Sequence, residues 1–127
     1  MIPAYSSIFP NSPDPVGLEI LIPHIEYSPA WNHFSPQEVI RMAILALYKQ
    51  YLPANSSSIH QYLKGSLSML DIVENLGVMR DHLVNYDWGK SQTGSNTLNY
   101  TIAPREIGFV ENLLQAAEFL DKNSVPK

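Results

Sequence analysis

Apolar residues recur at helical spacing along the segment that follows Pro36. Ser35 is a typical N-cap residue, and a proline suits the first turn of a helix. The Glu38 side chain is placed to accept a hydrogen bond from the Ser35 amide, which would complete a capping box. Pro53 cannot continue a helix and ends this one. Because residues 42–48 carry no charge, we expect the helix to be buried, either by its own domain or by a partner subunit. The apolar positions that define it are Val39, Ile40, Ala43, Leu47 and Tyr51.

Two shorter helices are predicted next along the chain. Ser58 and Gln61 have the spacing of a capping box, and Gly65 is a natural end for the helix that they begin. Ser68 offers a second N-cap, and the charge of Asp71 favours a helix start there. The apolar positions are Ile59, Tyr62 and Leu63 in the first helix and Met69, Ile72, Val73 and Leu76 in the second.

Beyond His82 the apolar period changes from that of a helix to that of a strand. Alternate residues are apolar on both sides of a polar segment, residues 89–96, whose glycine, serine and asparagine content favours a long flexible loop. This pattern predicts a β-hairpin that Pro104 ends, and residues 105–122 return to helical spacing. The alternating positions are Val84, Tyr86 and Trp88 on the first strand and Leu98, Tyr100 and Ile102 on the second.

The N-terminal residues differ in composition from the rest of the chain. Residues 1–15 contain four prolines, which remove backbone donors and block a regular helix. Partial alternation after this segment predicts a short strand that Pro23 interrupts. We therefore expect residues 1–34 to form an extended proline-rich arm, residues 35–122 to form the folded domain, and residues 123–127 to be a tail.

The predicted order of three helices, a hairpin and a further helix defines a mainly α protein with a small β-hairpin, an α+β fold. This order resembles a winged helix. Residues 97–104, Thr-Leu-Asn-Tyr-Thr-Ile-Ala-Pro, are similar to the last wing strand of PadR-like and MarR-like regulators where it enters their C-terminal dimerisation helix. The resemblance spans residues 35–120 in topology, although Val73 stands where the helix-turn-helix pattern prefers a small alanine. It implies a homodimeric DNA-binding protein.

The residues around Gly77 also look like a helix-turn-helix, with the glycine at the turn. There are therefore two alternative positions along the chain for the helix that would read DNA, which we call the first and the second register. In the first, one helix from Ser68 towards Leu83 is the reader and contains Gly77 at a cost of roughly 1 kcal/mol relative to alanine. In the second, residues 69–76 support a reading helix over residues 79–86. The strand alternation beyond His82 favours the first register.

Polar side chains near these helices are the candidate DNA contacts. Amide and hydroxyl groups can hydrogen-bond to base edges, and lysines near the second helix and in the wing suit the phosphate backbone. The lysines are equally well explained as solvated loop residues, and Asp71, Glu74 and Asp81 would repel phosphate. The candidates are Ser68 and Asn75 in the first register, Arg80 and His82 in the second, and Lys64 and Lys90 at the phosphates.

Overall charge and composition restrict the function further. With 8 Lys and Arg against 12 Asp and Glu, the net charge is −4, whereas neutralisation of phosphate supplies most of the affinity for nucleic acid. The absence of cysteine excludes disulfides and thiolate metal sites. No apolar run reaches the roughly 18 to 20 residues of a membrane span, and the first twenty residues lack Lys and Arg. We therefore expect no membrane contact, no signal peptide and a cytoplasmic location.

No motif in the sequence predicts catalysis, a metal site or a cofactor. None of the four histidines lies three or four residues from another, and no nucleophile, base or phosphate loop has a specific spacing. We expect a protein that is not an enzyme. The aromatic residues Tyr86, Trp88 and Tyr100 fit either of two roles. They form a stacking platform for single-stranded bases or, more commonly for such a set, pack across the hairpin in the core.

Two functions remain open for this fold. The first is a transcription regulator that binds double-stranded DNA as a homodimer. Its first and last helices would form the contact between the two subunits. The second is a winged-helix module that binds another protein and not DNA, with the proline-rich arm and the uncharged helix segment 42–48 forming the contacts. A positive strip joining Lys64, Arg80 and Lys90 would favour DNA, and an exposed apolar patch near the arm would favour a protein partner. The candidate dimer contacts are Ile40, Ile44, Leu47, Val110, Leu113 and Leu114.

Overall fold

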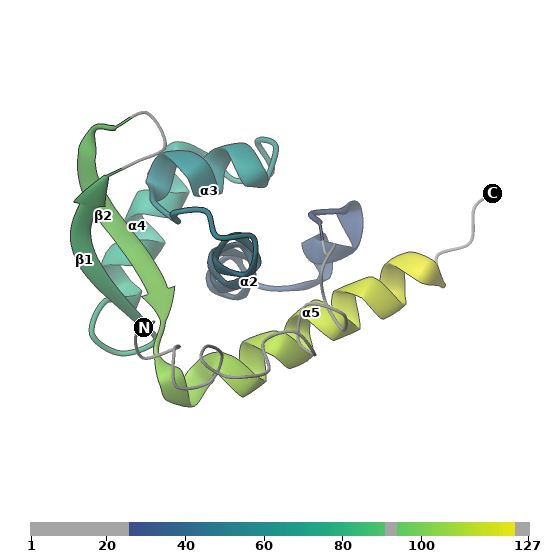
Figure 1. Ribbon diagram of the computed structural model, residues 1–127. Coiled ribbons are helices and arrows are strands. Elements are labelled where there is room, and N and C mark those ends of the chain that lie inside the picture. The colour runs from purple at the N-terminus through teal and green to yellow at the C-terminus, as the bar shows by residue number, and fades with distance from the viewer. Residues whose placement is uncertain (1–25, 91–93, 124–127) are drawn as a thin grey trace.

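A computed structural model describes residues 26–90 and 94–123 of the chain. It confirms a mainly α protein with a small β-hairpin and a C-terminal helix (Figure 1). The predicted arm and strand over residues 1–25, and the tail beyond residue 123, lie outside the described residues. In chain order the elements are the 3-10 helix η2 (Pro29–His33), α2 (Pro36–Lys49), α3 (Ser56–Tyr62), α4 (Met69–Met79), β1 (Val84–Lys90), β2 (Asn96–Ile102), the 3-10 helix η3 (Pro104–Glu106) and α5 (Ile107–Lys122).

Helix α2 is the centre of the fold. Its start is the predicted capping box: the Ser35 hydroxyl accepts a hydrogen bond from the Glu38 amide, and the Glu38 carboxylate accepts one from the Ser35 amide. Figure 1 shows α2 nearly end-on, with the hairpin on one side and α5 passing below. Residues 39–47 are all buried. The uncharged segment of this helix, predicted as a contact with a partner protein, is therefore covered by its own domain.

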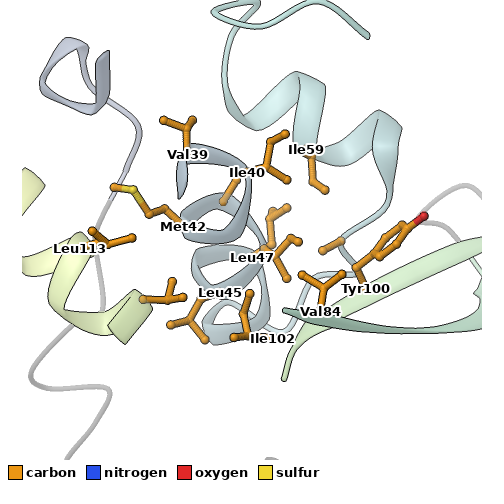
Figure 2. Close-up of a cluster of buried hydrophobic side chains, with 14 of the residues drawn as sticks. Val39, Ile40, Met42, Leu45, Leu47, Ile59, Val84, Tyr100, Ile102 and Leu113 are labelled. Atoms are coloured by element: carbon orange, nitrogen blue, oxygen red, sulfur yellow. The ribbon is translucent and has the colours of Figure 1, made fainter. Parts of the chain in front are cut away.

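The six residues predicted for a dimer interface lie in this core. In Figure 2, Leu47 faces the hairpin and Leu113 lies beside Met42. None of the six is more than 9% exposed, because α2 and α5 pack against each other within one chain. Their apolar spacing is thus accounted for by the core of the single chain, which corrects the dimer assignment of Ile40, Ile44, Leu47, Val110, Leu113 and Leu114.

Helix α3 begins earlier than the sequence pattern predicts. Asn55 is the N-cap, its side-chain oxygen accepts a hydrogen bond from the Ser58 amide, and the Ser58 hydroxyl accepts one from the Asn55 amide. The predicted box of Ser58 with Gln61 is wrong because asparagine, a strong N-cap residue, stands three residues upstream. Helix α4 begins as predicted, since the Ser68 hydroxyl accepts a hydrogen bond from the Asp71 amide.

Gly77 lies inside α4 and not at a turn between helices. The helix continues to Met79, and β1 begins at Val84 after a tight turn in which Asp81 has a φ of 70°. A reading helix over residues 79–86 is therefore wrong. The turn that joins consecutive helices lies upstream, where Lys64 and Gly65 both have positive φ.

The predicted hairpin is present, with longer strands than predicted. Trp88 is opposite Leu98, and the ladder continues to Lys90 opposite Asn96, so the loop is shorter than the predicted span 89–96. At the other edge of β2, the Tyr100 amide donates a 2.7 Å hydrogen bond to the Ala54 carbonyl. This bond attaches the hairpin to the segment between α2 and α3.

The folded domain also includes residues assigned above to the arm. Trp31 in η2 is 1% exposed, and its ring centroid lies 5.6 Å from that of Tyr27 and 5.9 Å from that of Tyr62. Helix η2 packs against α5. Residues 27–34 therefore belong to the folded domain, because a side chain as large as tryptophan contributes strongly when buried.

Candidate macromolecule-binding surface

Two of the predicted DNA contacts have side chains that already serve α4. Ser68 caps the helix through its hydroxyl. The Asn75 side-chain amide donates a 2.8 Å hydrogen bond to the Asp71 carbonyl, one turn earlier in the same helix. Both residues are explained by local helix structure, and neither needs a ligand.

The basic candidates lie at opposite ends of α4. Lys64 is in the turn before the helix, and Arg80 follows its last residue. The helix has 11 residues, so its two ends are separated by about 15 Å at 1.5 Å per residue. His82 is exposed in the turn to β1, where its carbonyl accepts a 2.9 Å hydrogen bond from Arg105. A continuous strip from Lys64 to Arg80 would thus have to cross α4.

The outward side of α4 is apolar and acidic. Ile72, Leu76 and Met79 turn inward and are buried, which leaves the opposite side of the helix in solvent. There Leu70 and Val78 are each 64% exposed and Val73 is 49% exposed. Helix α4 contains no Lys or Arg. We call this surface the α4 face; its members are Leu70, Asp71, Val73, Glu74 and Val78.

A second surface lies on the hairpin, on the side that turns toward the helices. Side chains two residues apart share a strand face, so Trp88 and Lys90 lie on the same face as Val84. Val84 is buried against α2 (Figure 2), whereas Tyr86 is 41% and Trp88 70% exposed. The face therefore begins in the core and ends in solvent.

Arg80 connects α4 to this hairpin surface. Its guanidinium carbon lies 5.4 Å from the centroid of the Tyr86 ring, which in turn lies 6.3 Å from that of Tyr100. Burial raises the pKa of Tyr100, and the nearby Arg80 cation acts in the opposite direction. We call the solvent-facing part of this surface the wing strip; its members are Arg80, Tyr86, Trp88 and Lys90.

The members of the aromatic set differ in burial. Tyr100 is 7% exposed and belongs to the core. Tyr86 and Trp88 are 41% and 70% exposed and do not belong to it. Sequence reasoning also placed Val73 among the apolar positions that define α4. The spacing of Ile72, Leu76 and Met79 defines one apolar side of the helix, and Val73 does not fit that spacing. This signal in the sequence could have predicted that Val73 is exposed to solvent.

Within the described residues, no three His, Asp or Glu side chains gather in a group that could hold a metal ion. None of the described helices has the length and apolar character needed to cross a lipid bilayer. Comparison of the chain with protein-family models, curated proteins and solved structures finds no match. The two surfaces defined above are thus the basis for a functional argument.

Proposed function

We propose that this chain is a winged-helix domain that binds a protein partner through the α4 face. The order of α2, α3, α4 and the hairpin is that of a winged helix, with α4 in the position of the reading helix and the hairpin in that of the wing. This support is topological. A shared topology does not choose between DNA and protein as the ligand, so the chemistry of the α4 face must do so.

The composition of the α4 face is the observation that carries the proposal. A helix in a DNA groove lies between two rows of phosphates, and Asp71 and Glu74 would repel them without any Lys or Arg on the helix to compensate. Leu70, Val73 and Val78 expose apolar area that another protein would remove from water at about 25 cal/mol per Å². Neighbouring exposed apolar side chains on one helix side are typical of protein interfaces.

A DNA-binding transcription regulator is the second candidate, and one observation favours it. Within residues 26–90 and 94–123, the ion pairs do not include Lys64, Arg80 or Lys90. These cations would have to supply the phosphate contacts. A homodimer would double them along the duplex. It would have to use apolar side chains that α5 leaves exposed, which are Phe109, Phe119 and Leu120.

Site-specific photo-crosslinking in the source cells tests the proposal. A photoreactive amino acid at Val73 should give an adduct with one protein, and the same group at Gln115, exposed on α5, should not. With that protein purified, Val73→Lys should weaken binding at least about tenfold, as expected when an apolar contact in an interface is replaced by a charge. Gln115→Lys should leave the affinity unchanged.

Two kinds of result would contradict binding of a protein partner by the α4 face. The regulator function would replace the protein partner if two results came together. Titration and light scattering would show a dimer that binds selected genomic duplex fragments in a salt-sensitive manner, and no adduct would be specific to Val73. Equal effects of Val73→Lys and Gln115→Lys would remove the α4 face from the interface.

A further inference from the structure

We propose that the wing strip is a binding site for single-stranded nucleic acid, which stacks unpaired bases on Trp88 and Tyr86 and places phosphates at Lys90 and Arg80. This surface is separate from the α4 face, so the proposal does not depend on the protein partner argued above. It adds a second ligand class to the same domain.

The exposed rings are the first argument. Trp88 is 70% exposed, although its cross-strand neighbour Leu98 packs against the core. An indole ring with an open π-face binds any base, and such stacking is worth several-fold in affinity for each base. Tyr86 is partly covered by Arg80, and an arginine over an aromatic ring adds a further flat cationic surface for a base.

The spacing of the rings favours a single strand over a duplex. Residues two apart on a β-strand lie roughly 7 Å from each other, which is about twice the 3.4 Å rise between stacked bases. Neighbouring bases must separate before they can reach both Tyr86 and Trp88. Bases held in a duplex cannot do so without unpairing, whereas an extended single strand can.

The charge around the strip is the third argument. Lys90 shares the strand face of Trp88, and in the described part of the chain the three ion pairs leave Lys90 and Arg80 out. The nearest acidic residue on β1, Asp87, lies on the opposite face, and its carboxylate accepts a 2.9 Å hydrogen bond from the Trp88 amide. The ends of β1 and β2 at Lys90 and Asn96 also lie away from α5, so that helix does not cover them (Figure 1).

A fluorescence titration with single-stranded oligo(dT) of about 12 nucleotides tests the site. The chain has two tryptophans, and Trp31 is 1% exposed, so quenching by bases reports on Trp88. A labelled oligonucleotide gives the affinity of variants that lack this signal. Trp88→Ala should weaken binding about tenfold and Trp88→Phe should restore most of it. Phe119→Ala, which removes an exposed aromatic ring from α5, is the matched control and should have no effect.

The salt dependence tests the phosphate contacts. Two cations predict a slope of log affinity against log salt concentration of about −1.4 for a single strand, and Lys90→Ala should reduce it to about −0.7. Lys64→Ala, at the far end of α4, is the control and should leave the slope unchanged.

Three results would overturn the proposal. They are absence of quenching at low salt, equal affinity of Trp88→Ala and Phe119→Ala for the oligonucleotide, and binding of a duplex of the same length more tightly than the single strand without dependence on Trp88. None of them affects the crosslink expected at Val73, so failure of this site and failure of the protein partner can be told apart.

Discussion

Asn55 is the residue through which the hairpin and helix α3 are joined. Its side-chain oxygen accepts a 2.9 Å hydrogen bond from the Ser58 amide, and its side-chain nitrogen donates a 3.2 Å bond to Asn99 on β2. Asn99 in turn donates a 3.3 Å bond to the Lys90 carbonyl. Asn55 is 3% exposed, and a buried amide is tolerated when its donors and acceptors are paired. One side chain therefore starts a helix and helps to position the wing.

Asn55→Ala should lower the free energy of unfolding by about 2 kcal/mol, because it removes a helix cap and a partly buried hydrogen bond together. Ser68→Ala removes only an exposed cap and should cost about 1 kcal/mol or less. Urea denaturation of the two variants measures the difference. If the two costs are equal, the bond to Asn99 contributes nothing to stability.

Helix α4 shows how an element can be recognised from sequence while its role in the fold is misjudged. The cap at Ser68 predicted its start, and the favoured register correctly placed Gly77 inside the helix, but that register extended the helix towards Leu83, whereas α4 ends at Met79. Glycine lowers helix propensity without forbidding a helix, and the packing of Ile72, Leu76 and Met79 against the core outweighs that cost. Tertiary contacts therefore decided where α4 ends.

Gly77→Ala should stabilise the protein by about 0.5–1 kcal/mol. Gly77 is exposed, and a Cβ there would meet only the Arg80 guanidinium at 3.7 Å, an ordinary contact. Gly65→Ala should instead destabilise, because Gly65 has a φ of 82° that alanine adopts at a cost. Thermal unfolding of both variants gives the two signs. A loss of stability in Gly77→Ala would show that the glycine is needed for more than chain geometry.

At the scale of the whole molecule, buried and partly buried aromatic side chains pack together from distant parts of the chain. Tyr62 at the end of α3 meets Trp31 of η2, and Tyr48 lies near the end of α2. Burial, with Tyr51 as a smaller cause, raises the pKa of Tyr48 to about 12. Burial, with Glu26 as a smaller cause, also raises the pKa of Tyr62. Both hydroxyls are held in the protonated form by the fold.

The raised pKa values of Tyr48 and Tyr62 predict that the free energy of unfolding falls at alkaline pH. An unfolded tyrosine titrates near pH 10, below the folded pKa of both residues, so the stabilisation is complete below about pH 10 and is lost as the pH rises above it. Urea midpoints at about pH 9 and about pH 11 should therefore differ, and Tyr62→Phe should reduce that difference. Tyr86→Phe, on the exposed wing strip, is the control. If both variants behave alike, the titration of Tyr62 does not control stability.

The sequence by itself determined the order and type of the elements from Ser35 onward, because these depend on local signals. The capping box at Ser35, the cap at Ser68, Pro104 and the alternation in the hairpin act within a few residues. The sequence did not determine the end of α2. The helix ends at Lys49 and not at Pro53, and Tyr51, predicted as one of its apolar positions, has a φ of 64° and is 79% exposed. Nor did the sequence determine the start of α3, because two overlapping capping patterns were present and Asn55 outcompeted Ser58.

Only the tertiary structure decided which apolar residues face solvent. Periodicity shows that an element has an apolar side, but what covers that side depends on elements far away in sequence. Thus Ile44 and Leu114, assigned to a dimer interface, are buried within one chain, whereas Val73 and Trp88 are exposed. The α4 face and the wing strip exist because α2 already fills the core, and no local pattern in the chain contains that information.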